Sequence, residues 1–179
     1  MKTIDKYIFQ ALDNYPYCLE DTIESLDYAL SYDAKNTIAL CLYGRIYAEQ
    51  LSDYETAKQY FQEVLGVNIH ALEVYVHYIQ TLLLNEDYKE AQKLIEFALT
   101  IKGINKAEIL LTKVLLLERT TTPKMALKLL KKVKLAHFSN QTYEIDEVEK
   151  RLKTKKELLS GKKPKKEDDG KAKRKGKKK

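Results

Sequence analysis

Three short segments recur along the chain at a nearly constant spacing. The segment that begins at Asp53 reads DYETAKQYFQEVL, and the segment that begins at Asp87, 34 residues later, reads DYKEAQKLIEFAL. A weaker copy, PKMALKLLKKV, begins at Pro123. Each segment holds one small residue, and with Thr22 further upstream these residues form a series with intervals of 35, 34 and 35 residues: Thr22, Ala57, Ala91 and Ala126. A period of this length predicts a solenoid, because units this small bury their apolar faces only by stacking.

The apolar residues between these markers recur at the three- and four-residue steps of a helix face. Short polar links such as Gln50–Asp53 separate the apolar patterns, so successive helices must lie antiparallel. We expect no strands. We expect helices near residues 3–14, 19–32, 37–50, 54–66, 71–84, 88–101, 107–119, 124–136 and 142–159.

The residues of the second unit carry a family resemblance. Its first helix has Leu40, then Tyr43 and Gly44, then Tyr47, and its second helix has Ala57, Phe61 and Val64. This pattern resembles the tetratricopeptide repeat, a helix–turn–helix unit in which small residues permit close helix contact. The resemblance implies an all-α, right-handed α-solenoid of about four units over residues 3–136, followed by a capping helix.

The chain departs from the family pattern at several points. Ile79 and Val114 replace the glycine in the third and fourth units, and one extra residue enters the second unit near Ser52. The proline expected between repeats is absent, and those positions hold Ala34, Ile69 and Gly103.

The sequence divides into a helical-repeat domain, residues 1–159, and a Lys-rich segment, residues 160–179. The capping helix near 142–159 has a narrow apolar stripe of Ile145, Val148, Leu152 and Leu158. The Lys-rich segment has eleven basic and three acidic residues and no aromatic or branched apolar residue. Because such a segment buries too little surface to offset its ordering entropy, we expect it to be disordered.

Charge is distributed unevenly along the chain. Residues 1–100 carry a net charge of −9, residues 101–159 carry +7 and residues 160–179 carry +8. With only Cys18 and Cys41, no membrane-spanning run and no signal peptide, the sequence predicts a cytoplasmic protein. An attraction between the Lys-rich segment and the acidic half, within one molecule or between two, is one consequence of this asymmetry. The sequence does not indicate an oligomeric state.

No catalytic, metal-binding or cofactor motif is present. The three histidines lie far apart and have no partner at ligand spacing, and no Gly-rich phosphate loop occurs. Cys41 and His77 fall on similar faces of adjacent units, but we interpret them as groove-lining residues because no third orienting group is evident. We expect a non-enzymatic protein without a cofactor.

The first helix of each unit lines the concave groove in this family, so residues flanking the packing positions become candidate peptide-binding residues. We interpret six tyrosines (Tyr43, Tyr47, Tyr54, Tyr75, Tyr78 and Tyr88) as core residues rather than a platform for bases. The groove candidates are Tyr7, Ile8, Ala11, Ile38, Cys41, Leu42, Arg45, Glu49, Glu73, Val76, His77, Gln80, Leu84, Glu108, Leu111, Thr112 and Leu115. This apolar floor with a few acids suits an apolar helix or an extended peptide with a basic residue. Two alternatives are that these side chains pack internally, or that the chain's own segment closes the groove.

The leading hypothesis is a protein-binding adaptor or scaffold. The alternative is a nucleic-acid- or ribosome-associated factor that contacts RNA or another polyanion without sequence specificity. Its candidate residues are Lys128, Lys131, Lys132, Lys162, Lys163, Lys165, Lys166, Lys173, Arg174 and Lys175. The lysines of this set on the eighth predicted helix could equally form a solvated face, and those of the Lys-rich segment could act only as a solubilising end.

Overall fold

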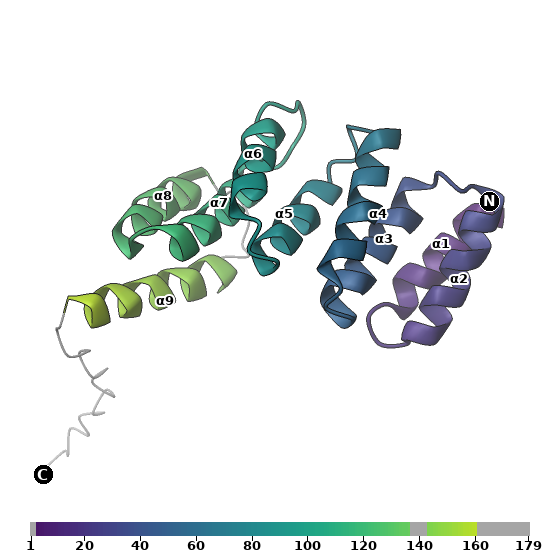
Figure 1. Cartoon of the computed structure of the whole chain (residues 1–179), viewed down its shortest axis with the longest axis horizontal. Helices are drawn as coiled ribbons and strands as arrows, with labels where there is room; N and C mark the ends of the chain where they lie inside the picture. Colours follow the sequence, from purple (N-terminus) through teal and green to yellow (C-terminus); the bar gives the residue numbers. More distant parts are fainter. Residues whose placement is uncertain (1–2, 137–142, 161–179) are drawn as a thin grey trace, which may run out of the picture.

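The computed structural model describes residues 3–136 and 143–160, and within them the chain forms α-helices and no strand (Figure 1). The helices are α1 (Thr3–Asn14), α2 (Leu19–Tyr32), α3 (Thr37–Arg45), α4 (Tyr54–Val67), α5 (Val74–Leu84), α6 (Tyr88–Ala98), α7 (Lys106–Thr120), α8 (Pro123–Ala136) and α9 (Tyr143–Leu159). A single π-helical turn, η1 (Ile46–Gln50), continues α3. Asn36, Asp53 and Asn105 cap α3, α4 and α7 by accepting backbone N–H groups of the first turn.

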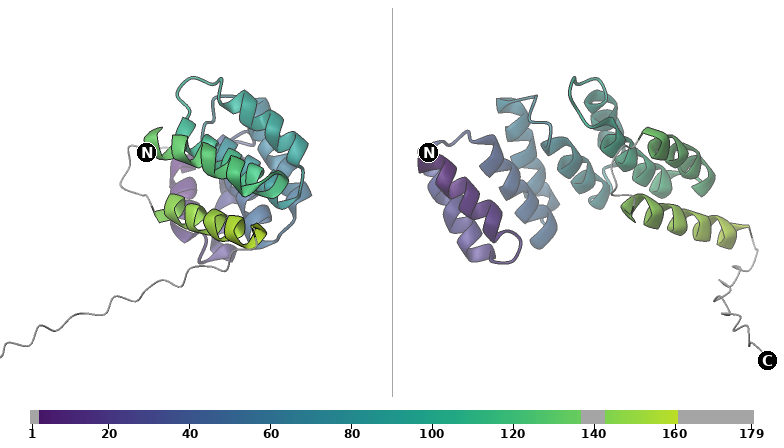
Figure 2. Two further views of the ribbon diagram at one scale, coloured as in Figure 1. Left: turned by 90° about the vertical axis from the view of Figure 1, so that its left-hand side faces the viewer. Right: turned by 180° about the vertical axis from the view of Figure 1, so that it is seen from behind.

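The helices pack as consecutive pairs, α1 with α2, α3 with α4, α5 with α6 and α7 with α8. Each pair also contacts the next, and Figure 1 shows the pairs side by side along the long axis of the molecule. The view from behind in Figure 2 shows α9 running beneath α8 at the far end. The predicted all-α solenoid is therefore confirmed, and α9 follows the last pair.

Buried apolar residues form a core that runs along the whole array. Ala57, Ala91 and Ala126, three members of the repeat series, are fully buried, and so is the fourth member, Thr22. Tyr43, Tyr75 and Tyr78 are also buried, whereas Tyr47, Tyr54 and Tyr88 are partly buried against the core, as expected for packing residues. Because every unit shares its core with a neighbour, no unit is an independent domain.

Position 44 requires glycine because an aromatic ring lies against it. A Cβ atom at Gly44 would lie 2.5 Å from an atom of the Phe61 ring, which is too close for any side chain. The corresponding positions Ile79 and Val114 are fully buried, and Ile95 and Leu130 replace Phe61 in those units. The departures from the family glycine thus follow the loss of the aromatic ring opposite.

The extra residue of the second unit lies in a helix rather than in the turn near Ser52. The Leu51 N–H donates to the Ile46 carbonyl, five residues earlier, in the wide turn η1. Such a turn accommodates one inserted residue at the end of a helix. The helix predicted near 37–50 is therefore confirmed in extent but changes its winding after Arg45.

Most predicted helix ends agree with the structure, and two differences are informative. Helix α5 begins at Val74 rather than near 71, and α6 ends at Ala98 rather than near 101, because turns occupy those residues. Leu158, expected in the apolar stripe of the cap, is 63% exposed, whereas Ile145, Val148 and Leu152 are buried against α7 and α8. Residue 142 and residues 161–179 lie outside the described residues.

Candidate functional site

A cavity of about 480 Å³ opens between α5, α7 and α9. Its apolar lining residues are Leu72, Val76, Ile104, Leu111 and Leu115. Its polar and remaining lining residues are Glu73, His77, Gln80, Gly103, Asn105, Glu108, Thr112 and Glu144. An apolar lining with several polar groups is typical of a binding site, and among the residues that the structure describes no Lys or Arg lines it.

Three exposed carboxylates lie at this cavity, one at the start of each of the helices α5, α7 and α9. Glu73 directly precedes α5, Glu108 lies in the first turn of α7 and Glu144 lies in the first turn of α9, at intervals of 35 and 36 residues. A helix N-terminus carries a partial positive charge and is therefore a favourable position for an acidic side chain. Across residues 3–136 and 143–160, no basic side chain forms an ion pair with any of the three.

A second cavity of about 590 Å³ continues the first along α9, and the two share Gln80, Leu115 and Glu144. The second cavity also contains Leu83, Leu84, Glu118, Arg119, Glu147, Val148, Arg151 and Lys155. Together the two cavities form a groove, which we call the α5–α7–α9 groove. Its charge changes along its length, because basic residues line only the second cavity.

Glu118 holds α9 in place as one wall of this groove. Its carboxylate is 5% exposed and accepts hydrogen bonds from Arg151, at 2.9 and 2.7 Å, and from Lys155, at 2.5 Å. The hydrogen bonds from Arg151 contribute most to lowering the pKa of Glu118, and those from Lys155 add to the effect. Arg119 instead donates to the Leu83 carbonyl at 2.6 Å and so ties α7 to α5.

The groove surface of the first two units is closed by a different cluster. The Tyr15 hydroxyl donates to Glu49 at 2.5 Å, and the Arg45 guanidinium lies 4.7 Å from the centre of the Tyr15 ring. Arg45 also donates to Glu49 at 3.2 Å, and His77 Nδ1 lies 3.7 Å from the same carboxylate. Tyr15, Arg45 and Glu49 therefore satisfy one another, whereas the buried His77 Nδ1 has no hydrogen-bond partner among the described residues.

Burial and pairing determine the ionisation of this cluster. Burial, followed by the hydrogen bond to Glu49, raises the pKa of Tyr15 to about 12. Burial opposes the charged form of Glu49, but the hydrogen bonds from Tyr15 and Arg45 outweigh it and lower the pKa of Glu49. Burial and the charge of Arg45 lower the pKa of His77, so the imidazole is neutral at pH 7.

The predicted groove residues separate into two groups. The structure brings those of the third and fourth units together at the first cavity, and Leu84 lines the second cavity. The residues at the first cavity are Glu73, Val76, His77, Gln80, Glu108, Leu111, Thr112 and Leu115. Sequence reasoning missed five residues of the first cavity: Leu72, Gly103, Ile104, Asn105 and Glu144. The interval of 36 residues from Glu108 was the signal that could have identified Glu144.

Several candidates of the first two units do not face an open groove, which corrects the expectation. Ile8, Ala11, Cys41 and Leu42 are buried in the core. Tyr7 stacks on Tyr28 and Tyr32 of α2, with ring centres 5.1 and 6.2 Å apart. Two features are the physical reason. Tyr15, in the α1–α2 turn (residues 15–18), covers part of this surface. The face of α1 that was expected to line the groove is the face that is buried in the core.

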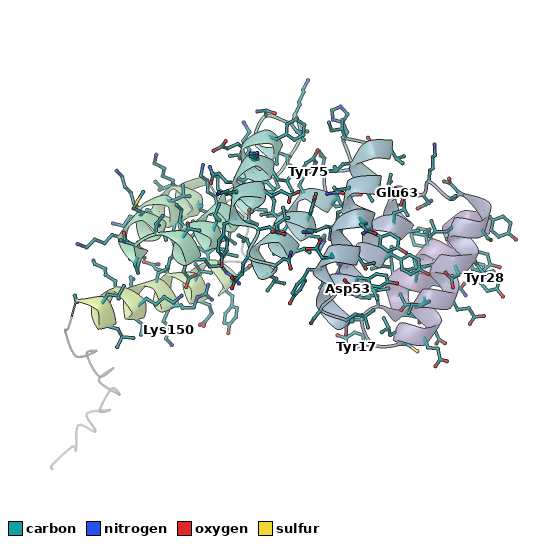
Figure 3. The ribbon with its side chains drawn as sticks, in the orientation of Figure 1. Tyr17, Tyr28, Asp53, Glu63, Tyr75 and Lys150 are labelled. Atoms are coloured by element: carbon teal, nitrogen blue, oxygen red, sulfur yellow. The ribbon has the colours of Figure 1, made fainter. Side chains whose placement is uncertain are left out.

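Other large side chains of the first two units are exposed. Ile38 is 45% exposed, Tyr28 is 48% exposed and Tyr17 is 93% exposed, and Figure 3 shows Tyr17 and Tyr28 at the edge of the molecule.

The Cys41 thiol is not activated by its surroundings. Burial raises the pKa of the Cys41 thiol to about 12, so no thiolate is present at neutral pH. Within residues 3–136 and 143–160, no three His, Cys, Asp or Glu side chains are grouped to hold a metal ion. No helix among them is both long and apolar enough to cross a membrane.

The basic candidates on α8 are exposed. Lys128, Lys131 and Lys132 lie on its outer face, together with Lys124, and none of the four pairs with an acid of the described residues. Lys134 instead pairs with Asp146 and Glu149 of α9. Residues 162, 163, 165, 166, 173, 174 and 175, the other basic candidates, lie outside the described residues.

Comparisons with known proteins give likenesses to solved structures. No family model and no curated protein matches the sequence. Among solved structures, a tetratricopeptide repeat protein from Parabacteroides merdae ATCC 43184 is similar over 85% of this chain and 72% of that chain, with 15% identity and a TM-score of 0.49. The assignment of an α-solenoid rests on the pairwise helix packing described above.

Proposed function

We propose that this chain is a tetratricopeptide-repeat type of adaptor that binds a peptide or helix of a partner protein in the α5–α7–α9 groove. The ligand carries an apolar anchor and basic residues, and the protein performs no catalysis. The observation that supports this proposal most directly is the set of three carboxylates, Glu73, Glu108 and Glu144, around an apolar cavity that contains no basic residue.

The chemistry of the ligand follows from the groups that the cavity leaves unsatisfied. Val76, Leu111 and Leu115 offer apolar surface to a side chain of Leu or Phe size. The carboxylates gain most from Lys or Arg groups, since no internal cation of the described residues pairs with them. Because one carboxylate lies at the start of each of these helices, the arrangement suits a ligand that lies across α5, α7 and α9.

Fluorescence anisotropy with a defined probe tests this proposal. The probe is a fluorescein-labelled Leu-Lys-Lys-Leu-Leu-Lys-Lys-Leu peptide, and the matched probe has Glu at each Lys. We expect the full chain to bind the first and not the second. The double variant Glu73→Gln/Glu108→Gln should weaken binding about three- to tenfold, because two exposed charge pairs are lost.

The matched control variant is Glu20→Gln/Glu24→Gln, which removes two exposed acids from α2 and changes net charge equally. It should bind the probe as the unmodified chain does. Equal weakening by both double variants would show a general charge effect and reject the groove as the site. Val76→Arg should abolish binding of an apolar anchor, and retained affinity in this variant would reject the cavity as well.

The unpaired lysines of α8 favour a second candidate function, contact with RNA or another polyanion. Replacing Lys128, Lys131 and Lys132 with Glu should weaken binding of a short oligouridine and lower its salt dependence, because phosphate contacts release counterions. The matched control replaces Lys89, Lys93 and Lys102, which are also exposed. An unchanged affinity and salt slope in the α8 variant would reject this candidate.

A further inference from the structure

The α5–α7–α9 groove has an order of charges along α9. Near the C-terminal half of α9, the second cavity contains Arg119, Arg151 and Lys155 together with Glu118 and Glu147, and Glu118 pairs with Arg151 and Lys155. Near the N-terminus of α9, the first cavity contains only carboxylates as charged groups, Glu144 among them. A chain that runs along the groove from the end of α9 toward its start therefore passes a region of mixed charge, which holds all the basic side chains of the groove among the described residues, before it reaches a purely acidic region.

The segment after α9 carries the opposite charges in the matching order. Glu167, Asp168 and Asp169 form an acidic triplet, and a basic cluster, residues 171–175, follows one residue later with the sequence KAKRK. Between α9 and the triplet stands the sequence GKKPKK, residues 161–166, which contains Gly161 and Pro164. Gly and Pro are residues that favour reversal of chain direction.

The segment is long enough to reverse direction after α9 and run back along this helix. At a rise of about 1.5 Å per helical residue, Arg151 and Glu144 lie roughly 13 and 24 Å back from Ser160. An extended chain covers about 3.3 Å per residue and needs about four and seven residues for these distances. After a reversal of about three residues, the acidic triplet reaches the level of Arg151, and the cluster 171–175 reaches the level of Glu144.

From this agreement of charge order and length, we propose that residues 167–175 of the chain bind its own α5–α7–α9 groove. The triplet 167–169 contacts Arg119, Arg151 and Lys155, and the cluster 171–175 contacts Glu73, Glu108 and Glu144. The segment then occupies the surface that a partner peptide needs, so segment and partner compete for the groove. This competition rests on the proposed function.

This internal contact is weak and readily displaced. The segment contains no apolar anchor, so it leaves the floor formed by Val76, Leu111 and Leu115 unfilled. Its attachment to α9 compensates, because a short flexible linker gives an effective concentration of about a millimolar. A partner with both an apolar anchor and basic groups therefore displaces the segment, whereas a purely basic peptide competes poorly.

Paramagnetic broadening in the full chain tests the contact directly. A nitroxide is placed at position 172 by Ala172→Cys in a Cys18→Ser chain, since Cys41 is buried and unreactive. We expect broadening of the Val76, Leu111 and Leu115 methyl signals, and none at Leu26. The broadening should vanish at about 1 M salt, where the Debye length is about 3 Å.

The decisive control exchanges the order of charges and keeps length and net charge. It carries Glu167→Lys, Asp168→Lys, Asp169→Lys, Lys171→Glu, Lys173→Glu and Lys175→Glu. We expect this variant to lose the broadening and to bind the Leu-Lys probe about two- to tenfold more tightly, as the fraction of open groove rises. Broadening that persists in the variant would overturn the proposed pairing.

Two further outcomes separate this inference from the proposed function. If the probe binds neither chain but the broadening is present, the adaptor function fails and the internal contact stands. If the probe binds both chains equally and no broadening is seen, the internal contact fails alone. Broadening transferred to an unlabelled, isotope-enriched chain in a mixture would show a contact between copies and would overturn the contact within one chain.

Discussion

The groove surfaces of units one and two and of units three and four differ although both use the same helix pairs. In the first two units, Tyr15, Arg45 and Glu49 satisfy one another across the surface. In the last two units, Glu73 and Glu108 have no cation among the described residues, and a cavity opens beside them. The difference shows that repeat spacing determines stacking, whereas the turns and added helices determine whether a surface is open.

The largest expected effect concerns the small position of the second unit. Gly44→Val should lower the free energy of unfolding by about 3 kcal/mol, because its side chain would overlap the Phe61 ring. At the equivalent position of the third unit, Ile79→Val should cost only about 1 kcal/mol. Urea denaturation of both variants measures the difference. Equal losses would contradict the view that Phe61 alone requires the glycine.

Removing the buried anchor of α9 should have the next largest effect. Glu118→Gln should destabilise the docking of α9 by about 2 kcal/mol, since Arg151 and Lys155 lose a charged acceptor. Hydrogen exchange should accelerate in α9 and remain unchanged in α3 and α4. The pKa of Glu118 is lower in the folded chain, so the same contribution is present above the ordinary Glu pKa and is lost as pH falls through the folded value. Uniform acceleration along the chain would contradict a local role.

Two single substitutions compare the closed and open surfaces directly. Glu49→Gln should cost about 1 kcal/mol of stability, because Tyr15 and Arg45 lose their charged acceptor. Glu73→Gln should change stability by less than about 0.5 kcal/mol, since its exposed carboxylate has no cation partner among the described residues. Thermal unfolding of both variants measures this. A larger loss of stability for Glu73→Gln than for Glu49→Gln would contradict the assignment of the Glu49 surface as closed and the Glu73 surface as open.

The smallest effect is a pH dependence that belongs to His77. Its pKa is lowered in the folded chain, so the unfolded chain binds more protons as pH falls through about 6.5. Stability should therefore decline from pH 7 to the folded pKa, and His77→Gln should remove that part of the slope. Unfolding free energies measured at several pH values test this. His70→Gln is the matched control for the replacement of an exposed histidine.

The helix pattern was predictable because each helix repeats its apolar residues at helical steps. The markers Ala57, Ala91 and Ala126 are buried as expected, and the third- and fourth-unit groove residues lie together at one cavity. The first-unit residues Ile8 and Ala11 were misplaced, because a single-sequence pattern does not reveal which apolar face of α1 meets α2 and α3.

Two further features depend on contacts between distant parts of the chain. Tyr15 and Glu49 are 34 residues apart, and the sequence of the turn does not show that this ring would cover the groove. Glu144 joins the cavity only because α9 packs under α7 and α8, which side-chain packing and Glu118 determine together. The interval of 36 residues from Glu108 points to Glu144, but local periodicity does not show the packing that brings Glu144 to the cavity.

The wide turn η1 has a consequence for how such an array tolerates changes in length. One added residue lies within Ile46–Gln50, yet α4 still packs against α3 and the next marker, Ala91, comes 34 residues after Ala57. Each residue inserted into a helix rotates the later residues of that helix by about 100°, so a single insertion alters which side chains emerge at the helix end while leaving the stacking unchanged. The length of a unit can therefore change while the stacking of the units stays the same. This helix end is a position where surface residues can vary without cost to the core.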